Sequence, residues 1–311
     1  MNTKQLITTT KYELQLNTSD ASKAFDYLPI NDSTRADYKA RIGLYIDYIN
    51  SHGLNRNTLL EYRRYLDNRT DYAISTKNKY FTSAKRYTGI LYTANLIPTD
   101  ITKDISGQDL KGFSQDKKHK KDGLTRAEVQ QLTEYLQNLD PTPANSRLKA
   151  MLALLMYQGL RQIEITRLDV TDIDTKTAKA LIRGKGKDDK EPIALHPNTT
   201  LALGDYLRLT NKKSGPLFSS NSNNSKDQRL TTRAIRLIIK QVLDQLDIDN
   251  SVHGFRHYFT TTMVSHYKGD LLAVAHYTRH KNLEMLQVYN DALDAEADLP
   301  RYYGAFEGVT L

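Results

Sequence analysis

The stretch "RHKNLEMLQVYND" (residues 279–291) decides how the end of this chain must fold, because His280 precedes Tyr289 by nine residues. Each residue of an α-helix turns by about 100°, so nine positions leave two side chains on opposite faces of one uninterrupted helix. Asn282 can cap a helix and Glu284 suits a first helical turn. We therefore predict a helix that begins after His280, which leaves the imidazole and the phenol able to converge.

Composition limits what the chain can be. Its 311 residues are 39% hydrophobic and 26% charged, with a mean hydropathy of −0.60, which is typical of a soluble globular protein with two domains. No apolar run approaches the roughly 20 residues of a membrane span and no secretion signal precedes the first helix, so we expect no membrane association and a cytoplasmic location. The absence of cysteine excludes disulfides, thiolate metal sites and cysteine nucleophiles.

The net charge of +8 and the pI near 9.3 favour a phosphate-rich partner such as nucleic acid. Most of the surplus, a net of +6, lies in residues 1–122. The first part of the chain is therefore expected to supply the larger share of the electrostatic attraction.

Three helices are predicted in this first part. The segment 33–53 has apolar residues at spacings of three and four, with Ser33 as N-cap and Gly53 as the stop. Segments 57–69 and 74–96 complete a small all-helical domain. In the last of these, four cations alternate with aromatic residues: Lys77, Lys79, Lys85 and Arg86. They are either a solvated face above an aromatic core or a set of DNA phosphate contacts, and the sequence leaves both open.

A polar, basic segment, residues 113–122, is interpreted as a linker. Thr125 followed by Glu128 is a capping-box pattern, so a second domain should begin near Gly123. That domain is expected to mix a buried helix within 147–168, a β-hairpin within 177–195 and a helix over 231–246. The predicted fold is mainly α with a small β-hairpin, divided into 1–20 (N-terminal extension), 21–112 (helical DNA-binding domain), 113–122 (linker) and 123–311 (catalytic domain with a C-terminal tail).

Three further segments carry chemically active side chains. "GLRQIEITRLDV" (159–170) contains Arg161 and Glu164, which could also be a simple surface pair. "RGKGKDDKE" (183–191) places Lys185 between two glycines at a hairpin tip, where most lysines remain solvated. "HGFRHYFTT" (253–261) puts His253 and Arg256 on one helix face, where imidazole can move a proton and guanidinium can clamp phosphate oxygens.

A metal site is the alternative reading of the histidines. His257 is four residues from His253, and His276 is four from His280, which is a spacing that zinc accepts. No acidic residue interrupts the pairs as in the HExxH motif, and Arg256 would lie close to the cation. We therefore expect no metal and no other cofactor.

Taken together, G-L-R-x-x-E-I, G-K-G on a hairpin, H-x-x-R-H and H-x8-Y, in this order, resemble the tyrosine recombinases of the phage integrase and Xer family. The resemblance covers nearly the whole chain, with the front domain similar to the family's core-binding domain and the rest to its catalytic domain. Three departures stand out: Arg279 where the family usually has Gly before the second histidine, "HGFRHYFTT" for the common H-x-L-R-H-T-F-A, and Pro192 after Glu191 in place of the usual arginine.

The resemblance implies that Tyr289 attacks a DNA phosphate to form a 3′-phosphotyrosyl link. Lys185 would protonate the leaving 5′ oxygen, and His253 would help with the proton of the tyrosine. Strands would be exchanged through a Holliday junction by a homotetramer on two specific DNA sites, with an accessory or directionality protein as a further conceivable partner. The tail after Tyr289 would dock on a neighbouring protomer, or else pack on its own domain.

The same resemblance assigns the phosphate to three side chains. Arg161 and Arg256 would grip its non-bridging oxygens, and His280 would hydrogen-bond to it. Glu164 would orient Arg161. Two other functions remain open at this point: a type IB topoisomerase, which uses the same chemistry to relax one duplex, and a DNA-binding accessory protein with a vestigial site.

Overall fold

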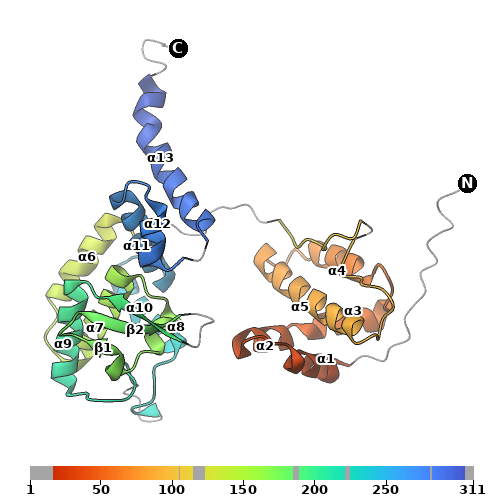
Figure 1. Ribbon diagram of the computed structural model, residues 1–311, viewed down its shortest axis with the longest axis horizontal. Coiled ribbons are helices and arrows are strands. Elements are labelled where there is room, and N and C mark those ends of the chain that lie inside the picture. The colour runs from red at the N-terminus through yellow and green to blue at the C-terminus, as the bar shows by residue number, and fades with distance from the viewer. Residues whose placement is uncertain are drawn as a thin grey trace, which may run out of the picture. The chain divides into compact units, whose positions relative to one another are not determined.

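The structure of the protein is a computed structural model, which describes residues 17–104, 106–114, 123–184, 189–220, 225–280 and 282–304. The chain divides into two compact units, Met1–Lys118 and His119–Leu311, each with a hydrophobic core of its own (Figure 1). Within the described residues, none of the helices combines the length and the apolar character that crossing a membrane requires.

The named secondary-structure elements in the described part of the first unit are all helices, and the loops that join them include an isolated β-bridge between Lys103 and Asp109. Its core is rich in tyrosine: the rings of Tyr45 and Tyr62 are fully buried with centroids 4.7 Å apart, and the Tyr45 hydroxyl hydrogen-bonds with Thr88 Oγ1 at 2.9 Å. Such tilted aromatic pairs add to the stabilisation that burial provides. The elements are α1 (Thr18–Ala24), a 3₁₀ turn (Phe25–Tyr27), α2 (Asp32–Lys39), α3 (Ile42–His52), α4 (Thr58–Asp67) and α5 (Ile74–Thr93).

The single helix predicted over residues 33–53 is wrong, because the chain forms two helices there. Asn31 rather than Ser33 caps α2, since its side chain accepts the Thr34 backbone N–H at 2.9 Å. The break follows Lys39, and the Arg41 guanidinium donates to the carbonyl of Asp37 at 2.6 Å, which satisfies an acceptor that the interrupted helix leaves open. The predicted stop is confirmed, because Gly53 ends α3 with φ of 82°.

The second unit contains more elements and the sheet. They are α6 (Arg126–Gln137), α7 (Pro143–Gln158), α8 (Gln162–Thr166), a 3₁₀ turn (Val170–Asp172), β1 (Ile173–Asp174), β2 (Lys179–Arg183), β3 (Lys190–Ala194), α9 (Pro197–Thr210), α10 (Thr232–Gln245), α11 (Val252–His266), α12 (Leu271–Thr278) and α13 (Glu284–Gly304). The strands form one antiparallel sheet in the order β1-β2-β3. The fold class, mainly α with a small β component, is therefore confirmed.

Local sequence signals account for several of these boundaries. The capping box before α6 is present: the Thr125 N–H donates to the Glu128 carboxylate at 2.6 Å, and the Glu128 N–H donates to Thr125 Oγ1 at 3.2 Å. The predicted hairpin is β2 and β3, in which Ala180 pairs with Ile193. Strand β1 was not expected, because two residues are too few to show an alternating pattern.

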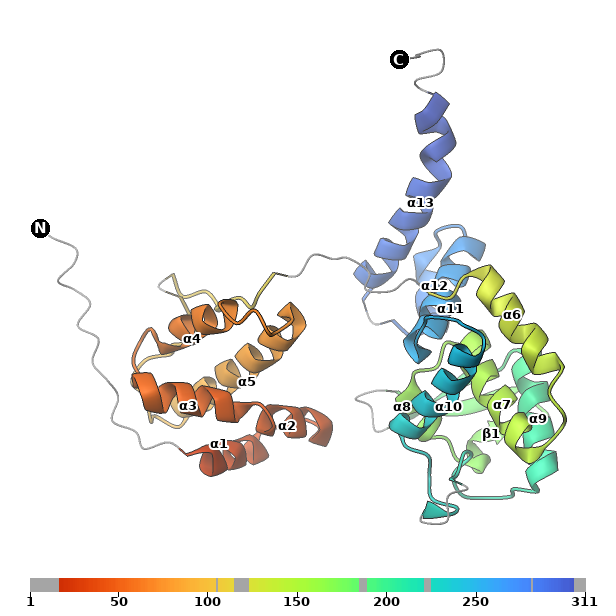
Figure 2. The same cartoon turned by 180° about the vertical axis from the view of Figure 1, so that it is seen from behind.

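Helix α7 is the buried centre of the second unit, and the turn that follows its C-terminal end positions Arg161. Met151 and Leu154 are fully buried, and α9 and α11 pack against the helix. Gly159 ends it in the left-handed conformation, with φ of 55°. The chain then turns sharply into α8, which places Arg161 at the N-terminus of that short helix. Both views of the ribbon show α13 extending away from the helices it starts on, α11 and α12 (Figures 1 and 2).

Replacing Gly159 by Ala should destabilise the second unit, because a Cβ there would lie 2.3 Å from Cδ1 of Phe259 on a backbone with φ of 55°. Strain and overpacking together predict a loss of about 3 kcal/mol in the free energy of unfolding. The matched control is Gly204→Ala in α9, where a Cβ meets nothing within 4 Å. There the lower chain entropy of alanine should stabilise the fold by about 0.5–1 kcal/mol. Urea unfolding of both variants checks this, and equal midpoints would contradict it.

Candidate active site

Arg256 lies at the centre of the candidate site. Its side chain comes from α11 and is only 4% exposed. One terminal nitrogen donates to the carbonyl of Gly159 at 2.5 Å, and the other donates to the carbonyl of Thr278 at 2.6 Å. These acceptors stand at the C-terminal ends of α7 and α12, where the helix dipole favours a cation. The guanidinium is therefore held in one place by three helices.

His280 lies directly beside this guanidinium. Its Nε2 is 3.4 Å from an Arg256 nitrogen, and its Nδ1 is 2.7 Å from Thr278 Oγ1. The Thr278 hydroxyl donates its own proton to the Val274 carbonyl at 2.8 Å, so Nδ1–H must be the donor to Thr278 and Nε2 the acceptor from Arg256. Burial, and then the charges of Arg256 and Arg161, lower the pKa of His280 to about 4. The ring is therefore neutral near pH 7.

Arg161 is tied to this group through a buried carboxylate. Glu164 is 1% exposed, and its Oε1 accepts from the Arg161 guanidinium at 2.9 Å while its Oε2 accepts the Arg161 backbone N–H at 2.8 Å. Burial alone would raise the pKa of Glu164, but Arg279 and Arg161 hold it below its ordinary value. The carboxylate is thus ionised and can orient Arg161.

Arg279 is a residue of the site whose role the sequence did not reveal. Its guanidinium donates to Glu164 Oε2 at 3.1 Å, and its side chain is 15% exposed. The backbone is left-handed there, with φ of 54°, a conformation that glycine adopts more readily than arginine. The sequence analysis noted Arg279 only as a departure from the pattern that the chain resembles, and nothing local indicated that it would fold back onto Glu164, 115 residues away.

Tyr289 is half-buried near the start of α13 and also belongs to this group. Helix α13 begins at Glu284, so the predicted helix start after His280 is confirmed. The Asn282 side chain accepts the Glu284 N–H at 2.9 Å from just before that start. The Tyr289 hydroxyl hydrogen-bonds with Nδ1 of His257, whereas the sequence had linked the phenol with His253. Burial raises the pKa of Tyr289, and the nearby charge of Arg256 opposes this.

The two remaining predicted catalytic residues are His253 and Lys185. His253 lies in the first turn of α11 with its ring 4.7 Å from that of His257, edge to face. Burial, Arg256 and Arg161 lower the pKa of His253. Lys185 lies outside the described residues. Within those residues, no group of three or more His, Cys, Asp or Glu side chains could hold a metal ion.

The four predicted DNA-binding cations of α5 fall into two pairs. Lys77 is 8% exposed and donates to the carbonyl of Asp67 at 2.6 Å. Lys85 forms an ion pair with Asp109 at 3.2 Å. Lys79 and Arg86, in contrast, are exposed. The burial of Lys77 favours a structural role for that residue.

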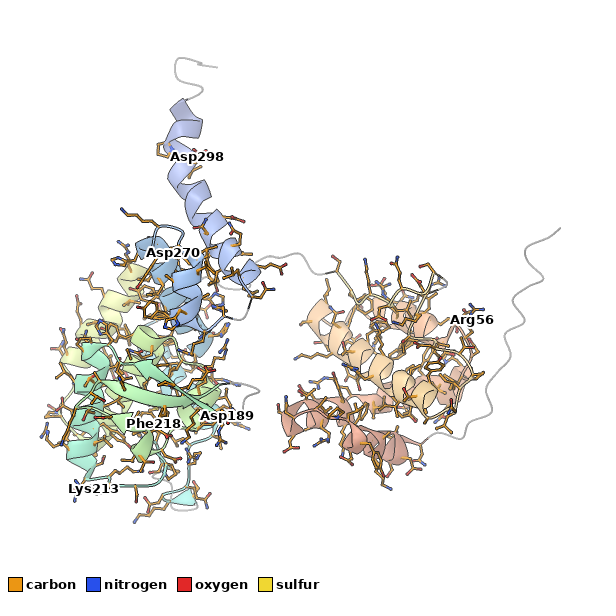
Figure 3. The ribbon with its side chains drawn as sticks, viewed as in Figure 1. Arg56, Asp189, Lys213, Phe218, Asp270 and Asp298 are labelled. Carbon is orange, nitrogen blue, oxygen red and sulfur yellow. The ribbon has the colours of Figure 1, made fainter. Side chains whose placement is uncertain are left out.

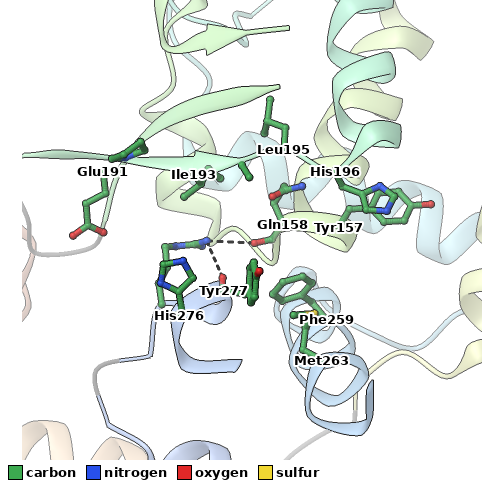
Figure 4. A pocket seen from close by; sticks show the side chains of 13 residues that line it. Tyr157, Gln158, Glu191, Ile193, Leu195, His196, Phe259, Met263, His276 and Tyr277 are labelled. Atoms are coloured by element: carbon green, nitrogen blue, oxygen red, sulfur yellow. Dashed lines mark hydrogen bonds between the residues drawn. The ribbon is translucent and has the colours of Figure 1, made fainter. Parts of the chain in front are cut away.

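A cavity of about 570 Å³ lies next to the site and is lined by residues of α7, β3, α11 and α12. Phe259 and Met263 of α11 face Tyr277 of α12 across it (Figure 4). Arg279 contributes to its wall, but none of the described residues proposed as catalytic does. The largely apolar lining indicates a place for packing rather than for phosphate chemistry.

The sequence matches the phage integrase family over residues 123–296. It is 26% identical to the tyrosine recombinase XerC of Roseiflexus sp. (strain RS-1) over 281 residues, which cover 86% of each chain. It is 32% identical to the XerC of Shewanella amazonensis over 187 residues, and that alignment spans 54% of this chain and 60% of the relative.

Solved structures show the same fold at low sequence identity. The site-specific recombinase XerH, bound to a palindromic difH substrate in a post-cleavage complex, superimposes with a TM-score of 0.66 at 15% identity and covers 92% of this chain and 86% of its own. The Tn1549 transposon integrase in complex with a circular intermediate DNA gives a TM-score of 0.63 at 14% identity, with 89% of this chain and 98% of the other covered.

Replacing Glu164 by Gln should cost about 3 kcal/mol of stability at pH 7, because Arg161 and Arg279 lose their shared buried counter-charge. The folded-state pKa of Glu164 lies below the ordinary 4.5, so its stabilising effect is complete above that pH and is lost as the pH falls through the folded value. Urea unfolding at several pH values should therefore show the difference between wild type and variant shrinking below pH 4.5. A difference that stays constant down to pH 3 would contradict the ion pairing.

Proposed function

The chain belongs to the phage integrase family, and on this basis we propose that Tyr289 is the nucleophile with which it cuts and rejoins DNA. Its enzymatic class is that of the tyrosine site-specific recombinases, and DNA is its partner. One observation carries the assignment of residues: the fixed Arg256 guanidinium lies 3.4 Å from His280 and close enough to the Tyr289 phenol for its charge to act on that group. A phosphate that binds this guanidinium would meet the phenol.

In the proposed reaction, the Tyr289 oxygen attacks the scissile phosphorus. The new P–O bond gives a 3′-phosphotyrosyl link, and the bond to the 5′ oxygen breaks. Lys185 would supply the proton to that oxygen. Attack by the 5′-hydroxyl of another strand then reverses the step on a new partner, so the energy of the phosphodiester is retained. Repeated on a second pair of strands, this passes through a Holliday junction.

The arginines would stabilise the charge that develops on phosphate. Arg256 is already fixed before DNA binds, so no reorganisation is needed as the pentacoordinate transition state forms. Arg161 gives one guanidinium N–H to Glu164 and can direct others to a non-bridging oxygen. His280 in its resting tautomer accepts at Nε2, and the negative charge of a bound phosphate would favour the protonated ring, which can donate there.

The first unit would add affinity for DNA. Lys79 and Arg86 are exposed on one helix, and the unit belongs to the part of the chain with most of the positive charge. We propose that they contact backbone phosphates, with Lys77 and Lys85 holding the helix in its own core. The protein would act in the cytoplasm on specific recombination sites, together with an accessory protein where direction is controlled.

Replacing Tyr289 by Phe should abolish covalent attachment to DNA while leaving DNA binding within about threefold, because only the reacting oxygen is removed. Binding sites are first selected from a library of random duplexes, and one is then built into a nicked duplex that traps the cleaved state. Denaturing gels measure the covalent adduct and band shifts measure binding. An adduct formed by the Phe variant would contradict the assignment, and a wild type that binds but never cleaves would indicate a DNA-binding accessory protein.

The tail beyond Tyr289 is proposed to join protomers in a homotetramer. Leu299 is 40% exposed, and Asp298 marks the part of α13 that extends past the rest of the unit (Figure 3). The apolar cavity bounded by Phe259 and Tyr277 is a suitable receiver for such a helix from a second copy. Packing on its own domain is the alternative.

Truncation after Asp294 keeps Leu286 and Tyr289, which pack the start of α13. If the tail docks on a neighbour, the truncated protein should still form the covalent adduct on one site within about threefold of wild type. Strand exchange between two sites should fall at least tenfold, because that step needs contacts between protomers. Both are measured on the same selected DNA. A loss of thermal stability with unchanged strand exchange would instead show that the tail packs on its own domain.

A further inference from the structure

The Tyr289 phenol lies against one particular imidazole, that of His257. The hydroxyl hydrogen-bonds with Nδ1, and the ring centroids are 5.6 Å apart at an interplanar angle of 48°. Tyr289 also packs on a small apolar cluster in which Val264, Val274 and Leu286 are buried. Helix packing among α11, α12 and α13 therefore fixes which histidine the phenol meets.

A neutral phenol can donate the proton of this hydrogen bond, with Nδ1 of His257 as the acceptor. Burial raises the pKa of Tyr289, so the hydroxyl is neutral near pH 7 and is available as a donor. An imidazole that accepts at Nδ1 carries its own proton on Nε2. The phenol must lose its proton when its oxygen bonds to phosphorus, and Nδ1 of His257 is already in hydrogen-bonding contact with that oxygen.

We propose that His257 is the general base of the reaction, a catalytic residue in addition to the six predicted from the sequence. As the Tyr289 oxygen forms its bond to phosphorus, the phenol proton moves to Nδ1 of His257, and the bond from phosphorus to the 5′ oxygen breaks. In the rejoining step the P–O bond to tyrosine breaks, and His257 returns the proton to the phenol. This inference rests on Tyr289 being the nucleophile.

The other two imidazoles are worse placed for this task. Both nitrogens of His280 face other partners, Thr278 and Arg256. His253 meets the ring of His257 edge to face rather than meeting the phenol. His253 thus borders the base and is suited to positioning it.

The first test measures single-turnover cleavage of the nicked duplex by His257→Phe and His257→Asn. Asparagine retains a hydrogen-bond acceptor close to the position of Nδ1 but cannot take up a proton. Both variants should cleave about 100-fold more slowly than wild type, the scale of general-base catalysis. The control is His266→Ala at the exposed end of the same helix, which should stay within twofold. Thermal unfolding checks that each variant is folded. Wild-type rates in His257→Asn would overturn the proposal.

The second test changes the acidity of the phenol. Tyr289 is replaced by a fluorinated tyrosine of lower phenol pKa, in the wild-type background and with His257→Asn. A base matters less for a more acidic phenol, so the 100-fold effect of His257→Asn should fall below about tenfold. An effect of unchanged size would mean that His257 only positions the ring, and would overturn the proposal. Tyr289→Phe in the same assay tests the nucleophile separately from the base. An adduct formed by that variant would show that Tyr289 is not the nucleophile, whatever the role of His257.

Discussion

The geometry of the site depends on the burial of one guanidinium. Moving the charge of Arg256 out of water is costly unless its N–H groups find acceptors. Gly159 and Thr278 supply those acceptors as free carbonyls at the ends of α7 and α12, where the helix dipoles already favour a cation. The same contacts hold the two helix ends on α11. A side chain proposed to bind phosphate therefore also determines how the surrounding helices meet.

This arrangement gives the site a surplus of positive charge. Arg161, Arg256 and Arg279 share a single buried carboxylate, Glu164. Burial, and then the charges of the neighbouring arginines, lower the pKa of His280 to about 4 and the pKa of Arg256 to about 10. An anion bound in the middle would relieve the repulsion among the arginines. The charge pattern thus favours a phosphate over a neutral ligand.

Local signals in the sequence predicted local structure well. The capping box at Thr125, the helix start after His280 and the hairpin each depend on residues a few positions apart, and all are present. The break after Lys39 was not predicted because it depends on the Arg41 side chain, which donates to the backbone carbonyl of Asp37. The spacing of apolar residues contains no information on such a hydrogen bond. The burial of Lys77 was not evident either, because the carbonyl that accepts from it belongs to Asp67, ten residues earlier at the end of the preceding helix.

Sequence spacing could not show whether His253 or His257 contacts the Tyr289 phenol. The two histidines lie one helical turn apart, and Tyr289 belongs to another helix, 32 residues after His257.

Arg279 shows how a departure from a family pattern can be accommodated by the same chemistry. Glu164 has two oxygens and receives donors on both, so a second guanidinium can bind without displacing the first. Arg161 consequently shares the carboxylate instead of holding it alone, which weakens the competition that Glu164 offers to an incoming phosphate. The additional arginine therefore stabilises the buried carboxylate, and in the proposed reaction it would leave Arg161 more available to the phosphate.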